Sequence, residues 1–538
     1  MSDTPQTPTG SDELHRLEQQ RRDNRDEVAA LGFDPYGRRT DGLLDTAEAA
    51  SRYDEAADLA NQEAESARKA FKKANPDAPE SEYPPGVDDR PRVKIAGRVV
   101  LHRDNGKLVW MNLRDGSGPG GKHDFQIAVS KRDCAENGFR VAKTTDLGDV
   151  IVAEGPLMRT KAGEITCWAS DVAPASKCLV PPPEKHAGLT DIEERYRQRY
   201  VDLWSSPETM GVFLARSNLV ARFRSFLQGR RFVEVETPML QAQAGGAAAR
   251  PFTTHMNALE LDLFLRIAPE LYLKRLLVGG MNRVFEINRN FRNEGVSPRH
   301  NPEFTMLELY EAFGDYMTMA ELTESMIRDG ARMVTGDDEP RIGFGEIEID
   351  YASPFQKAAY GDLFETHVGC SMLDEDAVRA AAEARKLKTV GKGGVPLDHW
   401  LLVGELFEAV CEDQIDPSRP TFVIDYPAAL CPLTKAEAGR PEIAERFELY
   451  IAGMEIANAY TELNDPDVQA ERFRAQLAGI DDEESTFRTF DEDFIRALKV
   501  GMPPAGGLGV GIDRVCMLLT GQTSIRDVIL FPLLRPRA

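Results

Sequence analysis

The sequence predicts an α+β protein in which an N-terminal β-barrel precedes a larger domain with an antiparallel sheet and flanking helices. Five short β-rich runs lie between residues 92 and 183. Two alternating runs flank a polar loop within Val284–Tyr310, and a glycine-rich run after residue 505 leads into an apolar, helix-like run. Short, closely spaced strands favour a barrel, whereas alternating runs joined by a polar loop favour an antiparallel hairpin.

The first 91 residues predict a charged helical extension. Helical patterns cover Glu13–Leu31 and Thr46–Ala74, and four prolines between residues 76 and 85 predict a stiff linker. Pro181-Pro182-Pro183 marks a second boundary. We therefore predict an extension and linker over 1–91, a barrel over 92–183 and a larger domain over 184–538.

The region 92–183 suits an OB-type barrel, a common platform for single-stranded nucleic acid. Its β-rich runs are Val93–Leu101, Leu108–Leu113, Phe125–Val129, Val150–Leu157 and Glu164–Trp168.

Residues 116–122, inside the barrel, match the start of a phosphate-binding P-loop. However, His123 replaces the required Ser or Thr, and residues 124–129 alternate like a strand instead of opening a helix. The segment is therefore predicted to be a flexible hairpin loop.

The segment Val284–Tyr310 predicts a nucleotide-binding hairpin. Alternation gives its strands one apolar and one functional face. The polar loop carries Arg292, Glu294, Arg299 and His300. Arginines flanked by glutamates suit bidentate phosphate contacts and ribose or base edges.

A second hairpin is predicted for residues 446–465, where a turn at Ala452-Gly453 separates two short alternating runs. Glu448 and Glu455 fall on opposite arms, and facing carboxylates repel each other unless a cation lies between them. Mg²⁺, with oxygen ligands and substrate phosphates, is the natural cation for such a pair.

The second arm of this hairpin carries Asn458, Tyr460 and Glu462 at alternate positions, so their side chains project to one side. Glu455 has the opposite parity. We therefore predict a β-bulge or a strong twist between Glu455 and Asn458.

The run Gly506–Gly511 predicts a glycine-rich strand that leads directly into a helix. Glycines allow the backbone to approach a flat ring closely. Arg514 falls in the first helical turn, where a cation opposes the helix dipole. Local stability does not favour arginine there, so an anionic ligand is predicted.

Together these segments resemble the class II aminoacyl-tRNA synthetases, in the form characteristic of class II lysyl-tRNA synthetases. FRNEG…RHNPEFTMLE resembles motif 2 of that class, and residues 506–514 resemble motif 3. Ser217–Gly229 followed by Phe232–Pro238 resembles motif 1, which lies at a dimer interface. The resemblance implies an OB-fold anticodon-binding domain, a class II antiparallel-sheet catalytic domain and a homodimer.

The resemblance also implies ATP as a substrate. The implied ATP-binding residues are Arg292, Glu294, Arg299, His300, Phe304, Glu448 and Arg514. Arg292 and Arg514 are the implied catalytic residues, at the α-phosphate and the γ-phosphate. Glu448 and Glu455 are the implied ligands of ATP-linked Mg²⁺.

The substrate amino acid is expected to carry a positive side chain. The implied lysine-binding residues are Gly246, Glu270, Arg292, Glu308, Tyr310, Asn458, Tyr460 and Glu462. Three carboxylates suit an ammonium group, and a site built for a buried polar group rejects analogues that lack it. Aspartyl- and asparaginyl-tRNA synthetases share the architecture but need a site for an acid or an amide.

Ala457 stands where bacterial lysine enzymes commonly carry glycine. A related enzyme that attaches β-lysine to an elongation factor also has alanine there, which leaves the lysine isomer open. That relative lacks an N-terminal anticodon domain, whereas this chain is predicted to have one.

The resemblance implies tRNA(Lys) as a partner of the barrel. The implied anticodon contacts are Arg98, Trp110, Phe125, Gln126 and Glu164. Trp110 is the main candidate for stacking on a base. Taken singly, Trp110 or Phe125 is more often a core residue.

The implied reaction is the activation of L-lysine to lysyl-adenylate, followed by transfer to the 3′ end of tRNA(Lys). The alternatives are a ligase that modifies a protein, an amino-acid-binding regulator and an RNA-binding protein. The set Arg292, Glu448, Glu455 and Arg514 argues against the last two. The barrel argues against the first.

Composition agrees with a cytoplasmic enzyme: the 538 residues contain no run of eighteen apolar residues, and the seven cysteines have no paired metal-like spacing. The net charge of −23 opposes tRNA binding unless basic residues are grouped. Arg222-Phe223-Arg224, Arg230-Arg231 and Lys274-Arg275 are the basic runs expected to form a local path for tRNA.

Overall fold

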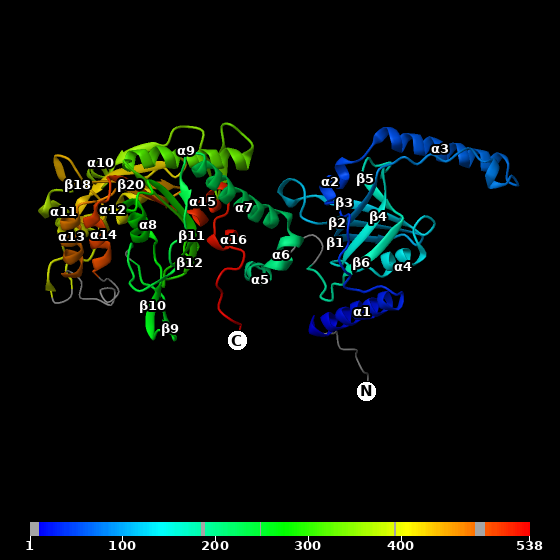
Figure 1. Ribbon diagram of the computed structural model, residues 1–538, viewed down its shortest axis with the longest axis horizontal. Helices are drawn as coiled ribbons and strands as arrows, with labels where there is room; N and C mark the ends of the chain where they lie inside the picture. Colours follow the sequence, from blue (N-terminus) through cyan, green and yellow to red (C-terminus); the bar gives the residue numbers. More distant parts are fainter. Residues whose placement is uncertain (1–9, 184–188, 248, 392–393, 479–489, 538) are drawn as a thin grey trace. The chain divides into compact units, whose positions relative to one another are not determined.

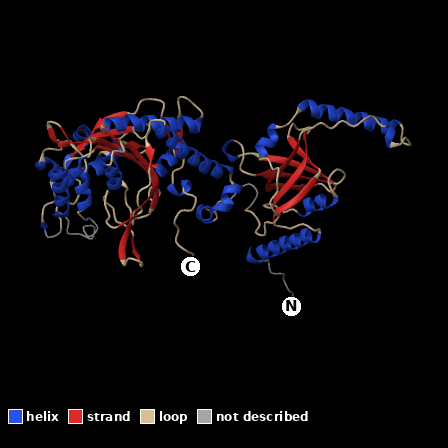
Figure 2. Ribbon diagram, in the orientation of Figure 1, coloured by secondary structure: helices blue, strands red, loops and turns tan. Residues whose placement is uncertain are grey.

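The computed structural model describes residues 10–183, 189–247, 249–391, 394–478 and 490–537 (Figure 1). They form two compact units, Met1–Leu214 and Ala215–Ala538. In each unit a sheet forms the centre and helices surround it (Figure 2). The predicted domain borders at 91/92 and 183/184 stay predictions.

The first unit contains the predicted OB barrel. Its strands are β1 (Arg92–Asp104), β2 (Leu108–Arg114), β3 (Asp124–Ser130), β4 (Val150–Arg159), β5 (Ile165–Ala169) and β6 (Asp171–Ser176). The order β1-β2-β3-β5-β4 closes because β1 also pairs with β4, while β6 is added to β4. The five predicted runs correspond to β1–β5, so the barrel prediction is confirmed.

Strand alternation fills the barrel. Val109, Met111 and Leu113 of β2 are fully buried, and the residues between them are partly exposed. A short helix, α4 (Glu136–Thr144), lies between β3 and β4 in the chain and presents Phe139 to the same core. After residues 116–122 the chain enters strand β3 and no helix follows, in agreement with the rejection of a P-loop.

A β-bulge changes the orientation of strand β1 midway. Val99 pairs with Leu113, but Leu101 pairs with Asn112, so the register shifts by one residue. Cross-strand partners share a face, and alternation is therefore reversed beyond the bulge. As a result, Arg103 lies on the outer face directly opposite Trp110.

The extension forms α1 (Gly10–Ala30), α2 (Thr46–Ser51), α3 (Glu55–Ala74) and a 3₁₀ turn, η1 (Glu80–Glu82). The predicted helical segment Thr46–Ala74 is therefore divided in two. The division has a local cause, because the Asp54 carboxylate accepts a hydrogen bond from Ala57 N and so caps a new helix.

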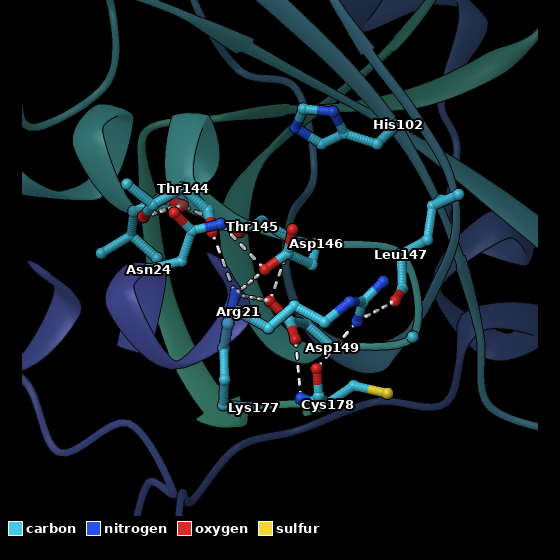
Figure 3. Close-up of polar contacts among 12 residues, drawn as sticks. Arg21, Asn24, His102, Thr144, Thr145, Asp146, Leu147, Asp149, Lys177 and Cys178 are labelled. Carbon is cyan, nitrogen blue, oxygen red and sulfur yellow. Dashed lines mark hydrogen bonds and ion pairs between the residues drawn. The ribbon is translucent and has the colours of Figure 1, made fainter. Parts of the chain in front are cut away.

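Helix α1 is attached to the barrel by side-chain hydrogen bonds (Figure 3). Arg21 Nη1 donates to the carbonyl oxygens of Leu147 at 3.0 Å and Cys178 at 2.8 Å. Asn24 Nδ2 donates to Asp146 Oδ2 at 3.0 Å. Helix α1 is thus joined to the barrel by these hydrogen bonds.

A buried lysine lies beneath α1 (Figure 3). Lys177 Nζ is 2.6 Å from Asp146 Oδ2 and 2.7 Å from Asp149 Oδ2. The lysine and Asp149 are buried, and such a cation stabilises two carboxylates that would otherwise repel each other.

Helices α5 (Ile192–Arg197), α6 (Arg199–Ser205) and α7 (Pro207–Gln228) follow the barrel. Arg199 of α6 is fully buried and pairs with Asp202 at 2.8 Å.

The second unit is built on a nine-stranded sheet with the order β15-β16-β18-β19-β20-β12-β11-β7, to which β17 adds at β18. Its strands are β7 (Val233–Glu234), β11 (Arg283–Phe291), β12 (Glu303–Ala312), β15 (Gln356–Ala359), β16 (Thr421–Pro427), β17 (Ala436–Glu437), β18 (Arg440–Ile451), β19 (Met454–Thr461) and β20 (Ala505–Gly511). A three-stranded sheet joins β8 (Leu240–Gln241), β9 (Thr253–Met256) and β10 (Leu261–Leu265), and β13 (Arg341–Phe344) pairs with β14 (Ile347–Asp350).

Helices cover this sheet, as expected for an α+β domain (Figures 1 and 2). They are α8 (Glu270–Val278), α9 (Tyr316–Thr335), α10 (Tyr360–Val368), α11 (Glu375–Ala384), α12 (His399–Val410), α13 (Pro466–Ala478), α14 (Glu492–Gly501), α15 (Ile512–Leu519) and α16 (Ile525–Val528).

The strand order brings the three predicted segments together. The hairpin β11–β12, the glycine-rich β20 and the hairpin β18–β19 are adjacent in the sheet although they lie far apart in the sequence. Asp513 fixes the start of α15 beside them, because its Oδ2 accepts a hydrogen bond from Thr305 N at 2.7 Å and its Oδ1 lies 2.6 Å from Arg216 Nη1.

None of the helices in the described ranges has the length and apolar character needed to cross a membrane. All seven cysteines are free thiols.

Candidate active site

Two adjoining cavities in the second unit bring most of the predicted site residues together. The larger, of about 730 Å³, is lined by Gly246, Glu270, Arg292, Asn458 and Tyr460, among others. The smaller, of about 220 Å³, is lined by Arg292, Glu294, Arg299, His300, Phe304, Glu455, Asn458 and Arg514, among others. Arg292 and Asn458 line both cavities, so the two predicted sets of residues meet at these side chains.

Arg292 stands immediately after strand β11 and faces the return strand. Its guanidinium carbon lies 5.1 Å from the centroid of the Phe304 ring, within reach of a cation–π contact. Its Nε is buried and has no hydrogen-bond partner among the described residues. A buried, unsatisfied donor is costly, which suits a group that binds an anionic ligand.

His300 and Arg514 contact each other across the smaller cavity. Arg514 Nη2 lies 2.9 Å from His300 Nε2, and Ser297 Oγ lies 2.8 Å from His300 Nδ1. Because arginine only donates, His300 Nε2 is the acceptor and the proton is on Nδ1. Burial and the Arg514 guanidinium lower the pKa of His300, which keeps the ring neutral.

The hairpin β18–β19 contains the predicted bulge. Leu449 pairs with Ala457, whereas Tyr450 pairs with Glu455, which leaves Ile456 as the extra residue. Asn458 Nδ2 consequently donates to Glu455 Oε1 at 3.1 Å, so the two side chains serve one site. The bulge prediction is confirmed.

The turn of this hairpin lies where the sequence predicts it. Ala452 and Gly453 both have positive φ angles, 52° and 67°. Arg299 Nη1 donates to the carbonyl oxygen of Gly453 at 2.9 Å, which connects this turn to the loop after β11.

Glu448 is held by three side chains. Arg446 Nη2 donates to Glu448 Oε1, and the hydroxyls of Tyr426 and Tyr450 donate to Glu448 Oε2 at 2.9 and 2.8 Å. Burial and the nearby Glu448 raise the pKa of Glu455. The two carboxylates therefore lie close enough to repel each other, and their oxygens are the donors that Mg²⁺ prefers.

A metal at this pair would need further ligands. Within the described ranges, no group of three or more His, Cys, Asp or Glu side chains is arranged to hold a metal ion. Two carboxylates suit Mg²⁺ that takes its remaining ligands from water and from phosphate oxygens.

Glu270 is the first residue of α8 and reaches the larger cavity. Gly246 lies against it with a φ of 84°, and a Cβ at Gly246 would lie 3.2 Å from the Glu270 Cβ. On the facing strand, the Tyr460 hydroxyl donates to Asn458 Oδ1 at 3.2 Å. The loop, α8 and β19 thus supply the predicted amino-acid pocket.

Two of the three carboxylates predicted to receive a substrate ammonium group already contact a lysine of the protein. Lys274 Nζ lies 2.6 Å from Glu270 Oε1 and 2.5 Å from Glu462 Oε2. Lys274 is fully buried and so cannot belong to a surface path for tRNA. Its position four residues after Glu270 on α8 places both side chains on one helical face.

Glu308 is buried beside this ion pair. Burial and the negative charge of Glu270 raise the pKa of Glu308 to about 8. Tyr310 is also buried, and its hydroxyl lies 3.5 Å from Glu308 Oε2. Glu308 therefore carries a proton near neutral pH and is a potential donor instead of a third negative charge.

The glycines of β20 allow side chains from neighbouring strands to lie flat on the sheet. A Cβ at Gly507 would lie 1.9 Å from Glu462 Oε1 and 2.6 Å from Tyr310 Cε1. A Cβ at Gly509 would lie 3.0 Å from Met306 Cε and 3.3 Å from Asn458 Oδ1. The sequence analysis attributed these glycines to a flat ligand ring, but at Gly507 the close approach is that of Glu462.

The barrel places some of the predicted nucleic-acid contacts on its outer face. Trp110 and Gln126 are partly exposed, and Glu164 is exposed just before β5. Arg103 is exposed and faces Trp110 across the strand pair, although the sequence analysis did not identify it. Because the β1 bulge interrupts the alternation of the strand, the sequence pattern alone does not predict that Arg103 lies opposite Trp110.

Two predicted barrel contacts need correction. Phe125 is 2% exposed and belongs to the barrel core, so the prediction that it meets a base is wrong. Arg98 Nη1 donates to Gly148 O at 2.6 Å, and its guanidinium lies 5.2 Å from the Trp204 ring centroid. Arg98 is therefore engaged within its own unit.

Sequence analysis also missed Arg446, which lines the larger cavity and contacts Glu448. Its alternate spacing with Glu448 on β18 is the signal that could have identified it.

The predicted basic path stays a prediction, although three arginines of the basic runs form ion pairs. Their ion pairs are Arg222 with Asp329, Arg224 with Glu234 and Arg275 with Asp491. Paired guanidinium groups offer less net charge to phosphates than the sequence suggests.

Two family models match the chain. "tRNA synthetases class II (D, K and N)" matches residues 191–535, and "OB-fold nucleic acid binding domain" matches residues 93–175. The chain is 49% identical to the lysine--tRNA ligase of Pelotomaculum thermopropionicum, over 84% of this chain and 87% of the relative. It is 48% identical to that of Carboxydothermus hydrogenoformans, over 83% and 89%. It is 47% identical to that of an Azoarcus species, over 82% and 87%.

Replacement of Gly507 by alanine is expected to destabilise the second unit by about 1–3 kcal/mol, because the added methyl overlaps Glu462 and Tyr310. Urea unfolding followed by tryptophan fluorescence measures the change. Gly511→Ala is the matched control, since its Cβ would meet no atom closer than 3.7 Å. Equal stability of the two variants would contradict the close approach of Glu462.

Proposed function

Because the chain belongs to the class II tRNA synthetases of the D, K and N group, we infer that it is a lysine–tRNA ligase. It activates L-lysine with ATP to lysyl-adenylate and transfers lysine to the 3′ end of tRNA(Lys). The observation that carries this conclusion is a cavity lined by Glu270, whose carboxylate is linked through Lys274 to the buried Glu462, and joined through Arg292 to a second cavity rich in arginine.

The amino-acid cavity is proposed to select lysine by charge. Glu270 and Glu462 would receive the ε-ammonium, and neutral Glu308 and Tyr310 would border it. Gly246 would lie beside the α-amino end, and Asn458 and Tyr460 would form the opposite wall. An aspartate side chain would meet carboxylates here, which opposes its binding.

The second cavity is proposed to bind ATP in line with the lysine carboxylate. Arg292 would contact the α-phosphate and the carboxylate, since it lines both cavities. Arg514, Arg299 and His300 would contact the β- and γ-phosphates. Most of the rate enhancement would then come from positioning and charge stabilisation.

Two further residues would hold the nucleoside, and two would hold the metal. Phe304 is proposed to stack beneath adenine, with Glu294 at the edge of the base. Glu448 and Glu455 are proposed to hold the Mg²⁺ of bound ATP, which supplies charge neutralisation for the phosphates.

The barrel is proposed to bind the anticodon of tRNA(Lys), with Trp110, Gln126 and Glu164 as contacts. Arg103 is added to this set because it is exposed opposite Trp110.

We further propose a homodimer formed through the motif 1 segment, with the reaction in the cytoplasm. The domain borders at 91/92 and 183/184 belong to the same proposal.

ATP–pyrophosphate exchange with different amino acids tests the function. L-Lysine is expected to support exchange, whereas aspartate is not, because its side-chain carboxylate would be repelled by Glu270 and Glu462. β-Lysine at the same concentration tests the isomer left open by Ala457. Exchange with aspartate, or with no amino acid, would contradict a lysine–tRNA ligase.

Replacement of Arg514 by alanine is expected to lower the exchange rate by about 10²–10³-fold, as for other donors that stabilise transferring charge. The measurement is lysine-dependent exchange at saturating ATP. Arg341→Ala is a suitable control, because Arg341 is exposed on β13 and contributes to neither cavity. Unchanged exchange in Arg514→Ala would remove this residue from the ATP site.

Trp110→Ala is expected to weaken tRNA(Lys) binding by about 1–3 kcal/mol through loss of base stacking. Aminoacylation at varied tRNA concentration measures the effect, while pyrophosphate exchange without tRNA should stay at the wild-type rate. Phe125→Ala is the contrasting variant and should destabilise the barrel by about 3–5 kcal/mol through a core cavity. Wild-type tRNA affinity in Trp110→Ala would exclude stacking on this residue.

A further inference from the structure

A fully buried lysine contacts Glu270, which lines the larger cavity. Lys274 is fully buried on α8, and its Nζ lies between Glu270 Oε1 at 2.6 Å and Glu462 Oε2 at 2.5 Å. Glu270 belongs to the same helix, whereas Glu462 follows strand β19. One ammonium group therefore connects two separate elements beneath the cavity.

Lys274 contacts Oε1 of Glu270 and Oε2 of Glu462, which leaves the second oxygen of Glu462 without a cation. Glu462 Oε1 is buried and has no hydrogen-bond partner among the described residues. It lies over Gly507, whose missing side chain provides the space that this oxygen occupies. A buried oxygen without a donor costs free energy, which a ligand ammonium would recover.

The charges of this group add to a value that matches one monovalent cation. The carboxylates of Glu270 and Glu462 share the single positive charge of Lys274, whereas burial and Glu270 raise the pKa of Glu308 to about 8 and so oppose a third negative charge. The buried set thus has one negative charge in excess. A lysine side chain would bring it to zero, and buried charge is least costly when it is balanced.

Building on the proposed function, we propose that Lys274 is a positioning residue for substrate selection. It holds Glu270 and Glu462 ionised and at a fixed separation, so that their second oxygens receive the ε-ammonium of the substrate. It also prevents the pocket from carrying two uncompensated negative charges before the substrate enters.

The titration of Glu462 provides a readout that a purely structural role would not change. The groups that face it are Lys274 and Glu270 from α8, Tyr310 from β12 and Tyr460 from β19. Burial raises the pKa of Glu462 to about 7, and Lys274 opposes that rise. Loss of Lys274 would raise this pKa further, so substrate binding would require a higher pH.

The experiment compares Lys274→Met with Lys177→Met in full-length protein. Lys177 is the matched control, because it is also buried and also bridges two carboxylates, Asp146 and Asp149, but in the barrel (Figure 3). Pyrophosphate exchange is measured at varied lysine, at varied ATP and from about pH 6 to pH 9.

We expect Lys274→Met to raise the KM for lysine by about tenfold or more, as removal of a partner of buried charges does. The KM for ATP should change by less than about twofold, because ATP binding depends on the other cavity. General damage to the active site would instead raise both KM values. The acidic limb of kcat/KM for lysine should move to higher pH. Lys177→Met should keep the wild-type KM and pH profile even if it unfolds at lower temperature.

The alternatives give different results. Unchanged KM and pH profile for lysine, or an equal rise in both KM values, would overturn the proposal. Lys274→Gln, which keeps a hydrogen-bond donor without the charge, replaces Lys274→Met if the latter does not fold. If neither folds while Lys177→Met does, Lys274 is a folding residue and the proposal fails. Absence of lysine-dependent exchange in the wild type would instead reject the proposed function.

Discussion

Burial of several carboxylates at the centre of one sheet is the constraint on which the rest of the second unit depends. Glu270, Glu308 and Glu462 are at most 5% exposed, so each needs a proton, a cation or a hydrogen-bond donor. The fold meets this need in different ways, with Lys274 beneath two of them and a retained proton on Glu308. Ligands are expected where a buried carboxylate oxygen has no proton, cation or hydrogen-bond donor from the protein.

The sheet makes this arrangement possible because four of the seven residues of strand β20 are glycines. Strand β20 lies between β19 and β12, and its glycines admit side chains that project from both neighbours. The same strand continues directly into α15, which brings Arg514 to the second cavity. One segment therefore provides space for the amino-acid pocket and a cation for the nucleotide pocket.

Much of this could be predicted from the sequence. The two hairpins, the strand-to-helix junction and the bulge before Asn458 follow from parity and turn residues, which are local properties. Lys274 could not be identified in this way, because a glutamate four residues before a lysine is also the pattern of a solvated helix face. Its role depends on Glu462, which is distant in sequence and reaches it only through the sheet.

The error at Phe125 has a different origin. Phe125 shares the buried parity of its strand whereas Trp110 does not, so alternation places Phe125 in the core and only the family resemblance assigned it to a base. In β1 the bulge reverses the pattern halfway along the strand, so Arg98 and Arg103 have unequal surroundings although both are arginines in one strand.

This bulge allows a single strand to serve two different surroundings. If all residues of β1 were instead paired in one regular register from Val99, Arg103 would lie opposite the buried Val109 and His102 opposite Trp110. Arg103 would then be directed into the apolar interior, and His102 would be directed outward. The extra residue of the bulge therefore changes which residues face outward at one end of β1.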